Sequence, residues 1–207
     1  MANLGLKERY DFQQWIIKDL KDKNGYIQRD ATQYNSRLAM DEELLWDFLM
    51  ETQEETMDYL LKKLSKETII TLINKEIVKG GFLFALKEGV FIENKQLRLL
   101  YRKPATSFNE KAVQQYKANR LSVIEEVVYE EGGRIDLVIF INGLALFAIE
   151  LKFNPSGQSV QDAIKQLKGR NPNNRLFRFE QGVLASFAVD TMEIYMTTQL
   201  KGQETYF

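Results

Sequence analysis

The sequence predicts an α/β protein, an α+β arrangement in which helices flank a mixed β-sheet after a helical N-terminal region. Apolar residues recur at helical spacing through most of the first half of the chain. The second half instead carries several short apolar runs that are typical of strands. All three prolines lie at or beyond Pro104, which suits a helical first half. With 207 residues, of which 44% are apolar, the chain can form one large domain or one domain with an appendage.

Three segments of the first half are expected to be helical: 6–22, 40–64 and 66–79. The first shows the i, i+3, i+4, i+8 pattern of an amphipathic helix at Phe12, Trp15, Ile16 and Leu20. Asp41 is a suitable N-cap for the second segment, and Gly80 with Gly81 ends the third. We therefore expect residues 1–95 to be a mainly helical region that packs on the second half.

Residues 96–207 are expected to form the sheet and its flanking helices. The expected strands are 96–102, 120–129, the two arms of a hairpin within 132–152, 182–190 and 192–198. Helices are expected at 109–118 and 159–168. The second of these has one apolar face, made by Val160, Ala163, Ile164 and Leu167, and Ser159 can cap its start.

The chain contains no cysteine and no histidine. The missing cysteines exclude disulfides, thiolate-bound zinc and thiol nucleophiles. The missing histidines exclude Ser-His-Asp triads, imidazole-bound metals and every histidine general base. An enzyme with this sequence must therefore use carboxylates, Lys, Tyr, Ser or Thr, and carboxylate–metal chemistry is the leading option.

No apolar run is long enough to cross a bilayer, and the N-terminus lacks the basic-then-apolar layout of a signal peptide. We therefore expect a cytoplasmic protein that has no membrane partner. The chain ends in "GQETYF" directly after strand-like sequence, and we expect it to be the front portion of a longer polypeptide.

The formal net charge is -1, so the chain as a whole is not a polycation that binds nucleic acid. The charges are unevenly spread, however. Residues 41–58 hold acids and no bases, and we interpret them as a solvated face. A basic stretch, residues 163–179, holds no acids and contains Lys165, Lys168, Arg170, Arg175 and Arg178. Because this stretch follows the charged hairpin described next, it is a candidate for phosphate contacts.

The hairpin reads "GGRIDLVIFINGLALFAIELK" over residues 132–152 and is almost wholly apolar, yet it carries Asp136, Glu150 and Lys152. Burying a charge is costly unless the charge is paired or bound to a metal. Glu150 and Lys152 are two residues apart, so on a strand they point to the same face. Asn142-Gly143 is a strong turn signal that brings Asp136 beside them. Two carboxylates are suited to Mg²⁺, and a neighbouring lysine can stabilise an attacking hydroxide.

This convergence depends on the register of the hairpin. A strict two-residue turn pairs Ile141 with Leu144, which sets Asp136 opposite Ile149 and turns Glu150 to the other face. The chemistry therefore requires a β-bulge, a three-residue loop or a strong twist at the strand ends. The alternative is a surface hairpin whose end carries an ordinary salt bridge among Asp136, Glu150 and Lys152.

The hairpin and the segments "SGQSVQDAIKQLKGRNP" and "LFRFEQGVLASFAVDTMEIYMTTQLKGQETYF" closely resemble the N-terminal nuclease region of the R subunit of type I restriction–modification enzymes. The upstream stretches "LAMDEELLWDFLMETQ" and "LRLLYRKPATSFNEKAVQQYKANRLSV" fit the same family. The resemblance covers nearly the whole chain. It implies a restriction-endonuclease-like core of the PD-(D/E)xK superfamily within residues 96–207.

The resemblance also implies roles for individual residues. Asp136 matches the acidic metal ligand, and Glu150 with Lys152 matches the E-x-K pair of the motif. The segment before Asp136 is "GGRI", so the proline of the motif is absent. The family places a glutamine-led Q-x-x-x-Y motif on the helix after the hairpin. Gln166 matches its glutamine, whereas Arg170 stands where tyrosine is common, which suggests a phosphate contact there.

Two further metal ligands are expected on the same basis. The backbone carbonyl of Leu151 is expected to join the two carboxylates. Many such nucleases add a glutamate from a helix, and Glu8 is the candidate here, although a solvated acid at the helix start is the preferred interpretation of that residue.

The resulting hypothesis is a Mg²⁺-dependent (or Mn²⁺-dependent) endonuclease domain that cleaves double-stranded DNA in defence against foreign DNA. Lys165, Lys168 and Arg170 are expected to neutralise backbone phosphates, with Gln166 as a positioning residue. Modification and specificity subunits are the expected partners. An ATP-driven motor follows in full-length relatives, but these 207 residues contain no G-x-x-x-x-G-K-[ST] pattern, so ATP is expected to bind the full-length chain only. The alternatives are another nuclease of the superfamily, in repair or recombination, and a catalytically silent docking module.

Overall fold

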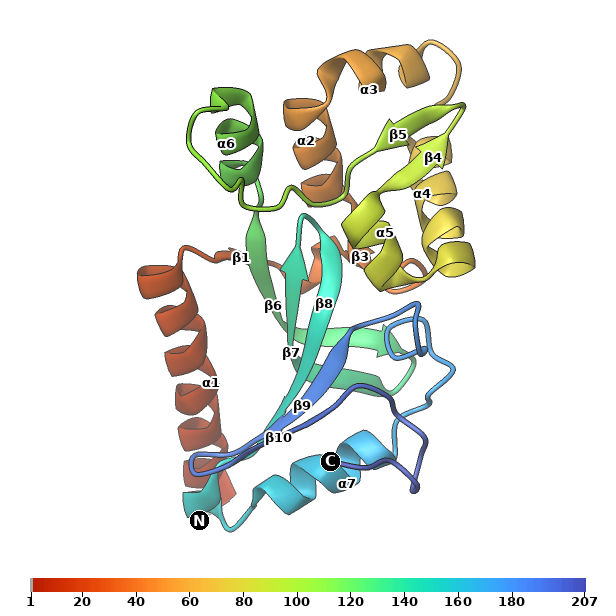
Figure 1. The fold of residues 1–207 in the computed structure, drawn as a ribbon. Coiled ribbons are helices and arrows are strands. Elements are labelled where there is room, and N and C mark those ends of the chain that lie inside the picture. The colour runs from red at the N-terminus through yellow and green to blue at the C-terminus, as the bar shows by residue number, and fades with distance from the viewer. Residues whose placement is uncertain (1) are drawn as a thin grey trace.

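The protein is described by a computed structural model that covers the backbone of residues 2–207 and the side chains of residues 10–155 and 157–207. Its centre is a mixed sheet, as expected from the sequence (Figure 1). The strands of this sheet are β1 (Ile27–Arg29), β2 (Tyr34–Asn35), β3 (Met40–Asp41), β6 (Leu121–Glu130), β7 (Gly133–Ile141), β8 (Leu144–Leu151), β9 (Ala185–Val189) and β10 (Ile194–Thr197).

The strands β6, β7 and β8 form an antiparallel meander at the middle of the sheet. β1 adds to β6 in parallel, and β9 adds to β8 in parallel, followed by antiparallel β10. β8 pairs with a further strand at its start, where Leu144 lies opposite Met40 of β3. Figure 1 shows that the last part of β6 and the first part of β7 bend away from β8. The sheet is therefore open beside the last residues of β8.

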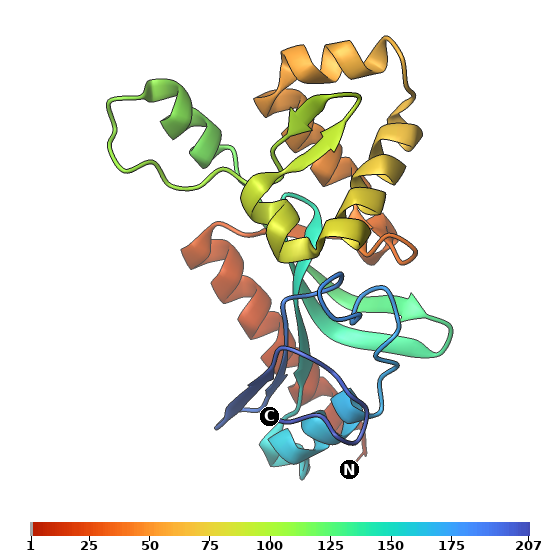
Figure 2. The same ribbon diagram turned by 45° about the vertical axis from the view of Figure 1, so that its right-hand side comes forward.

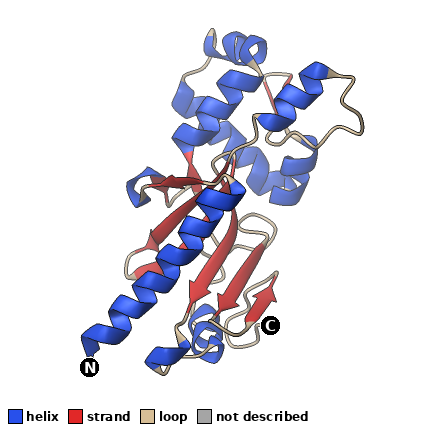
Figure 3. Ribbon diagram, turned by 90° about the vertical axis from the view of Figure 1, so that its left-hand side faces the viewer, coloured by secondary structure: helices blue, strands red, loops and turns tan. Residues whose placement is uncertain are grey.

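Two helices cover opposite faces of this sheet. α1 (Ala2–Asn24) crosses one face, as Figure 3 shows, and buries Ile17 against Leu137, Ile139 and Leu151. α7 (Val160–Lys168) covers the other face and packs in a cluster with Val138, Phe140 and Ala148, which alternate with the first set along the strands. Both faces of β7 and β8 are therefore buried, which explains why the hairpin sequence is apolar almost throughout.

Four other helices build a second layer of structure with its own core. These are α2 (Glu42–Thr52), α3 (Glu54–Leu61), α4 (Lys66–Gly80) and α5 (Phe82–Glu88), which enclose a small sheet of β4 (Val90–Ile92) and β5 (Lys95–Leu97). Figure 2 shows this helical part on the turn side of the β7–β8 hairpin. Among residues 2–207, no helix is both long and apolar enough to span a bilayer.

Several expected elements differ in the structure. The expected helix 40–64 is broken at Gln53, which has φ -142° and ψ 38°. The Gln53 side chain accepts from the Arg98 backbone N–H at 2.7 Å and donates to the Arg98 carbonyl at 2.9 Å. A contact 45 residues away in sequence thus overrides the local helical pattern. The expected strand 96–102 ends at Leu97 because the chain leaves the small sheet there.

Other elements were not expected. α5 follows α4 directly, and β1, β2 and β3 lie within the region expected to be helical, yet they belong to the main sheet. α6 (Glu110–Lys117) matches the expected helix at 109–118 but has no buried residue, and it stands away from the body in Figures 1 and 2.

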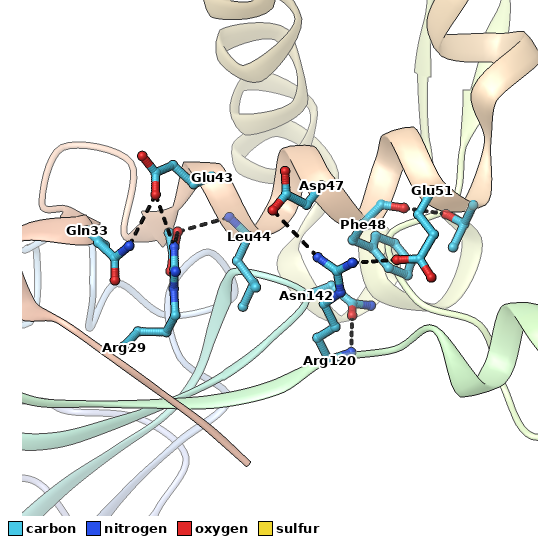
Figure 4. Close-up of polar contacts among 11 residues, drawn as sticks. Arg29, Gln33, Glu43, Leu44, Asp47, Phe48, Glu51, Arg120 and Asn142 are labelled. Atoms are coloured by element: carbon cyan, nitrogen blue, oxygen red, sulfur yellow. Dashed lines mark hydrogen bonds and ion pairs between the residues drawn. The ribbon is translucent and has the colours of Figure 1, made fainter. Parts of the chain in front are cut away.

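The helical part is joined to the sheet by two arginines, shown in Figure 4. Arg29 of β1 forms a two-pronged ion pair with Asp41, whose carboxylate also accepts from the Leu44 N–H at 3.0 Å and caps α2. Arg120, at the start of β6, reaches Asp47 and Glu51 on the outer side of α2. These contacts hold α2 and the residue that caps it against β1 and the start of β6.

Candidate metal centre

A β-bulge in β8 sets the register of the hairpin. Ile141 lies opposite Leu144 and Phe140 opposite Ala145, as a two-residue turn requires. The register then shifts, so that Ile139 lies opposite Phe147 and Leu137 opposite Ile149. Leu146 is the extra residue, and its carbonyl accepts from the Leu184 N–H at 2.9 Å outside the hairpin. The bulge that the chemistry required is therefore present, and it brings Asp136 to the same face as Glu150.

The three charged side chains of the hairpin lie together and are almost fully buried. Asp136 is 3% exposed, Glu150 is 1% exposed and Lys152 is 2% exposed. One oxygen of Asp136, Oδ2, accepts from the Leu151 N–H at 2.7 Å. The Lys152 backbone N–H donates to the Val189 carbonyl at 2.8 Å, which holds the chain next to β9 just after β8 ends. The alternative of an exposed salt bridge on a surface hairpin is thereby excluded.

Glu150 is the centre of the charge arrangement. Its Oε1 lies 3.1 Å from Lys152 Nζ, which also donates to the Leu151 carbonyl at 3.1 Å. Its Oε2 lies 2.8 Å from Arg170 Nη2. Burial raises the pKa of Glu150, and the nearby Asp136 carboxylate raises this pKa further, whereas Lys152 and Arg170 act in the opposite direction. The two cations therefore offset only part of the cost of keeping this carboxylate ionised.

Backbone strain accompanies the site on the neighbouring strand. Glu126 has φ +54° in the middle of β6, between the Glu125–Leu137 and Val127–Ile135 pairs, so it lies across from Asp136. Its side chain pairs with Arg134 at 2.7 Å. A non-glycine residue in this conformation costs about 1–3 kcal/mol and persists only where the surrounding structure enforces it. Such strain is common at functional sites.

Tyr129 is a site residue that the sequence analysis missed. It lies near the end of β6, its hydroxyl accepts from Arg170 Nη1 at 2.8 Å, and the guanidinium lies 5.4 Å from its ring centroid. A Cβ on Gly133 would come within 2.7 Å of this ring, so the glycine makes room for it. The second glycine of the "GG" before Asp136 was the available signal, because a glycine within strand-like sequence indicates a close approach by another group.

The helix after the hairpin agrees with the expected burial. Val160, Ala163 and Leu167 of α7 are buried on the sheet, and Ile164 is partly buried in the same cluster. Ser159 and Asp162 form a capping box at its start. Lys165 is exposed and Lys168 is half-buried on the outer side. These positions are compatible with the proposed phosphate contacts.

The positions of Gln166 and Arg170, the residues at the glutamine and tyrosine places of the glutamine-led motif, could not be predicted from the motif alone. Gln166 is exposed, and no hydrogen bond joins its side chain to the part of the chain whose side chains are described, so the structure does not bring it to the carboxylates. Arg170 turns inward after α7 and binds Glu150 rather than continuing the outer row of lysines. Glu8 lies in α1, and its side chain is outside the described residues.

The donor set suits a hard divalent cation. It consists of Asp136, Glu150 and the Leu151 carbonyl, all of which are oxygen ligands. Among the described residues there is no group of three or more Asp, Glu, His or Cys side chains that could hold a metal. Mg²⁺ is commonly bound through one or two carboxylates while it keeps several waters, so this small set fits Mg²⁺ better than a cation that needs a full protein cage.

The fold and this geometry define an α/β protein with a buried carboxylate–lysine site at the end of a bulged hairpin. Residues 6–205 match the family model described as Type I restriction enzyme R protein N terminus. The chain therefore belongs to the family of type I restriction enzyme R protein N termini. No curated protein matches the chain.

Proposed function

We propose that this chain is a Mg²⁺-dependent endonuclease domain that hydrolyses phosphodiester bonds of double-stranded DNA for a type I restriction enzyme. One observation carries the proposal: the bulge at Leu146 turns Asp136, Glu150 and Lys152 to one buried face. Two buried carboxylates side by side are destabilising by themselves, so their presence favours a role in binding a cation. Membership of the restriction enzyme family favours DNA as the substrate.

Each residue of the site has a proposed task. Asp136 and Glu150 hold the cation together with the Leu151 carbonyl. When bound, Mg²⁺ supplies Lewis acidity toward the phosphate and lowers the pKa of a bound water. Lys152 is fixed by Glu150 and by the Leu151 carbonyl, so its ammonium is already oriented to stabilise the negative charge that develops during attack on the phosphate.

The outer side of α7 is the proposed contact for the DNA backbone. Lys165 and Lys168 lie in the last turn of the helix, whereas its acid, Asp162, lies in the first turn. Lysines in such positions neutralise phosphates without reading bases, so sequence choice would come from a separate specificity subunit. ATP binding is proposed only for the motor of a full-length R subunit, because this chain has no P-loop sequence.

The proposal is tested by plasmid nicking with the R subunit assembled with its modification and specificity subunits, ATP and Mg²⁺. Asp136→Ala and Glu150→Ala should abolish nicking. Asp58→Ala is the matched control, since Asp58 is exposed on α3 and distant in the fold from the hairpin end. Nicking by both site variants at the rate of the control would disprove the nuclease assignment.

Metal binding separates the nuclease from the catalytically silent docking module. Calorimetric titration of the protein with Mn²⁺ should show binding that is lost in the Asp136→Ala/Glu150→Ala double variant and kept in Asp58→Ala. Equal binding by the double variant and the wild type would place the cation elsewhere. A folded wild-type protein that binds no divalent cation would instead support the docking module.

A further inference from the structure

Arg170 occupies a position that the proposed reaction does not explain. Its Nη2 is 2.8 Å from Glu150 Oε2, while Lys152 Nζ is 3.1 Å from Glu150 Oε1. Both oxygens of this carboxylate are thus engaged by cations. Lys152 belongs to the hairpin itself, but Arg170 arrives from the chain after α7, so its contact is the one that can be released without disturbing the strands.

The guanidinium and a divalent cation cannot both interact favourably with Glu150 at the same point. The Oε2 atom already accepts a charge-assisted hydrogen bond from the guanidinium, which occupies the space beside this oxygen. A divalent ion between Asp136 and Glu150 would also lie close to the positive charge of Arg170. In a buried site this repulsion is poorly screened. Arg170 therefore opposes metal binding for as long as it remains on Glu150.

Arg170 has donors that suit a second partner. Its Nη1 donates to the Tyr129 hydroxyl at 2.8 Å, and its Nε is buried without a hydrogen-bond partner among the described residues. The side chain is 14% exposed, so part of it can be approached from solvent. Arginine presents a planar fork that matches two phosphate oxygens, so a DNA phosphate is a suitable partner for this guanidinium once it leaves Glu150.

We propose that Arg170 is the phosphate-binding group of this site and that it competes with the divalent cation for Glu150. A backbone phosphate that enters the site draws the guanidinium from Glu150, and the freed oxygen becomes a metal ligand. Tyr129 remains in contact with the arginine through its hydroxyl and its ring, and so limits how far the side chain moves. Metal and DNA then bind cooperatively. This inference rests on the proposed function, since it needs both a metal and DNA at the site.

The competition is tested first without DNA. Mn²⁺ affinity is measured by calorimetry for the wild type, Arg170→Gln and Arg170→Met, with thermal unfolding to show that each variant is folded. Both variants should bind Mn²⁺ about tenfold more tightly than the wild type, because the competing charge is gone. Equal or weaker binding by both folded variants would overturn the competition and make Arg170 a support that orients Glu150.

The cooperativity is tested with a short fluorescent DNA duplex and Ca²⁺, which also takes oxygen ligands and is used here to avoid hydrolysis. For the wild type, DNA should raise Ca²⁺ affinity within the usual coupling range, about 5–150-fold, and Ca²⁺ should raise DNA affinity by the same factor. In Arg170→Gln this factor should fall close to one. Lys168→Gln is the matched control: it should weaken DNA binding but keep the wild-type coupling factor.

The outcomes distinguish this inference from the proposed function. If neither the wild type nor the folded Arg170 variants bind a divalent cation, the metal site itself is wrong and both proposals fail. If all bind with equal affinity and the coupling factor is unchanged in Arg170→Gln, the metal site stands and only the role of Arg170 is overturned.

Discussion

The two ends of the β7–β8 hairpin solve the problem of buried polar groups in opposite ways. At the turn end, Asn142 is fully buried and neutral, and both the oxygen and the nitrogen of its side-chain amide are hydrogen-bonded. At the other end, Asp136, Glu150 and Lys152 are just as deeply buried but charged. The first end is built for stability, whereas the second keeps charges that an ordinary core would exclude.

The turn end is a satisfied network of amides, part of which appears in Figure 4. The Asn142 side-chain carbonyl accepts from the Arg120 N–H at 2.7 Å. Its amide group donates to the Leu99 carbonyl and to Asn119 Oδ1, both at 2.9 Å. Asn119 in turn bonds to the backbone of Tyr101. Asn142 thereby holds both ends of the segment that contains α6: Leu99 before the helix, and Asn119 and Arg120 after it.

The site end instead depends on a balance of charges that are only partly neutralised. The raised pKa of Glu150 means that burial and Asp136 together outweigh the stabilising effect of Lys152 and Arg170. Polar networks that are incompletely compensated cost stability, and proteins retain them where a ligand or a reaction uses them. Burial of polar groups is common to both ends of the hairpin, so it is the unbalanced charge that distinguishes the end proposed to be functional.

The largest effect is expected for Lys152→Ala. Its ammonium is proposed to act in the transition state, so its loss should reduce cleavage by about 10²–10³-fold while metal binding is kept, in a variant that thermal unfolding shows to be folded. Single-turnover cleavage by the assembled enzyme measures this. Lys75→Ala, an exposed lysine on α4, is the control and should cleave normally. A Lys152→Ala enzyme that cuts at the wild-type rate would remove this residue from the mechanism.

Next in size is Gly143→Ala at the turn end. Gly143 has φ +80°, and a Cβ there would lie 2.3 Å from the Asp41 carbonyl oxygen and 2.6 Å from the Leu45 nitrogen. Backbone atoms cannot move aside easily, so we expect a loss of about 3 kcal/mol in the free energy of unfolding. Gly132→Ala is the control, because Gly132 has φ +70° with nothing within 4 Å of its Cβ position. Denaturant unfolding should show the smaller loss, about 1 kcal/mol, for the control; similar losses would mean that the close approach to Asp41 is unimportant.

Asn142→Ala should have a somewhat smaller effect on stability. The substitution leaves the Arg120 N–H, the Leu99 carbonyl and Asn119 without their buried partner, which costs about 2 kcal/mol. Asn94→Ala is the control, because Asn94 also has a positive φ, +61° against +49° for Asn142, but is exposed. The control therefore measures only the stability lost because alanine tolerates positive φ less well than asparagine. If the two variants lose equal stability in denaturant unfolding, the buried network contributes little.

The smallest expected effect is a pH-dependent rise in Tm caused by Mg²⁺ at the end of the hairpin that carries Asp136 and Glu150. Because the pKa of Glu150 is raised on folding, the folded protein holds this proton more tightly than the unfolded chain. The stability that comes from protonated Glu150 is fully present below the unfolded pKa and is lost as pH rises through the folded pKa. A divalent cation bound at the proposed site would relieve the resulting repulsion between Glu150 and Asp136. Mg²⁺ should therefore raise Tm by about 2–4 °C near neutral pH and by less in mild acid.

Differential scanning calorimetry with and without Mg²⁺ at the two pH values checks this expectation. Glu150→Gln should remove the pH dependence of the Mg²⁺ effect, because its side chain does not ionise. An equal rise in Tm at both pH values would show that Mg²⁺ acts away from Glu150.

Much of this protein was determined by local sequence. The alternation and length of the apolar runs predicted β6 to β10, because the sheet period and its turn signals are local properties. The apolar face of α7 followed from helical spacing in the same way. The absence of histidine and cysteine left carboxylates, Lys, Tyr, Ser or Thr for any catalysis, which made carboxylate–metal chemistry the leading option and so led to Asp136, Glu150 and Lys152.

Tertiary structure decided what depends on partners distant in the sequence. The bulge at Leu146 places its carbonyl on Leu184, and the break at Gln53 comes from its pairing with Arg98. Arg170 and Tyr129 meet at Glu150 although they come from opposite sides of the hairpin sequence. Hydrogen bonds and ion pairs between distant segments leave no periodic trace in the chain. The sequence therefore determined which charged residues the hairpin carries, and only the folded structure decided which of them face one another.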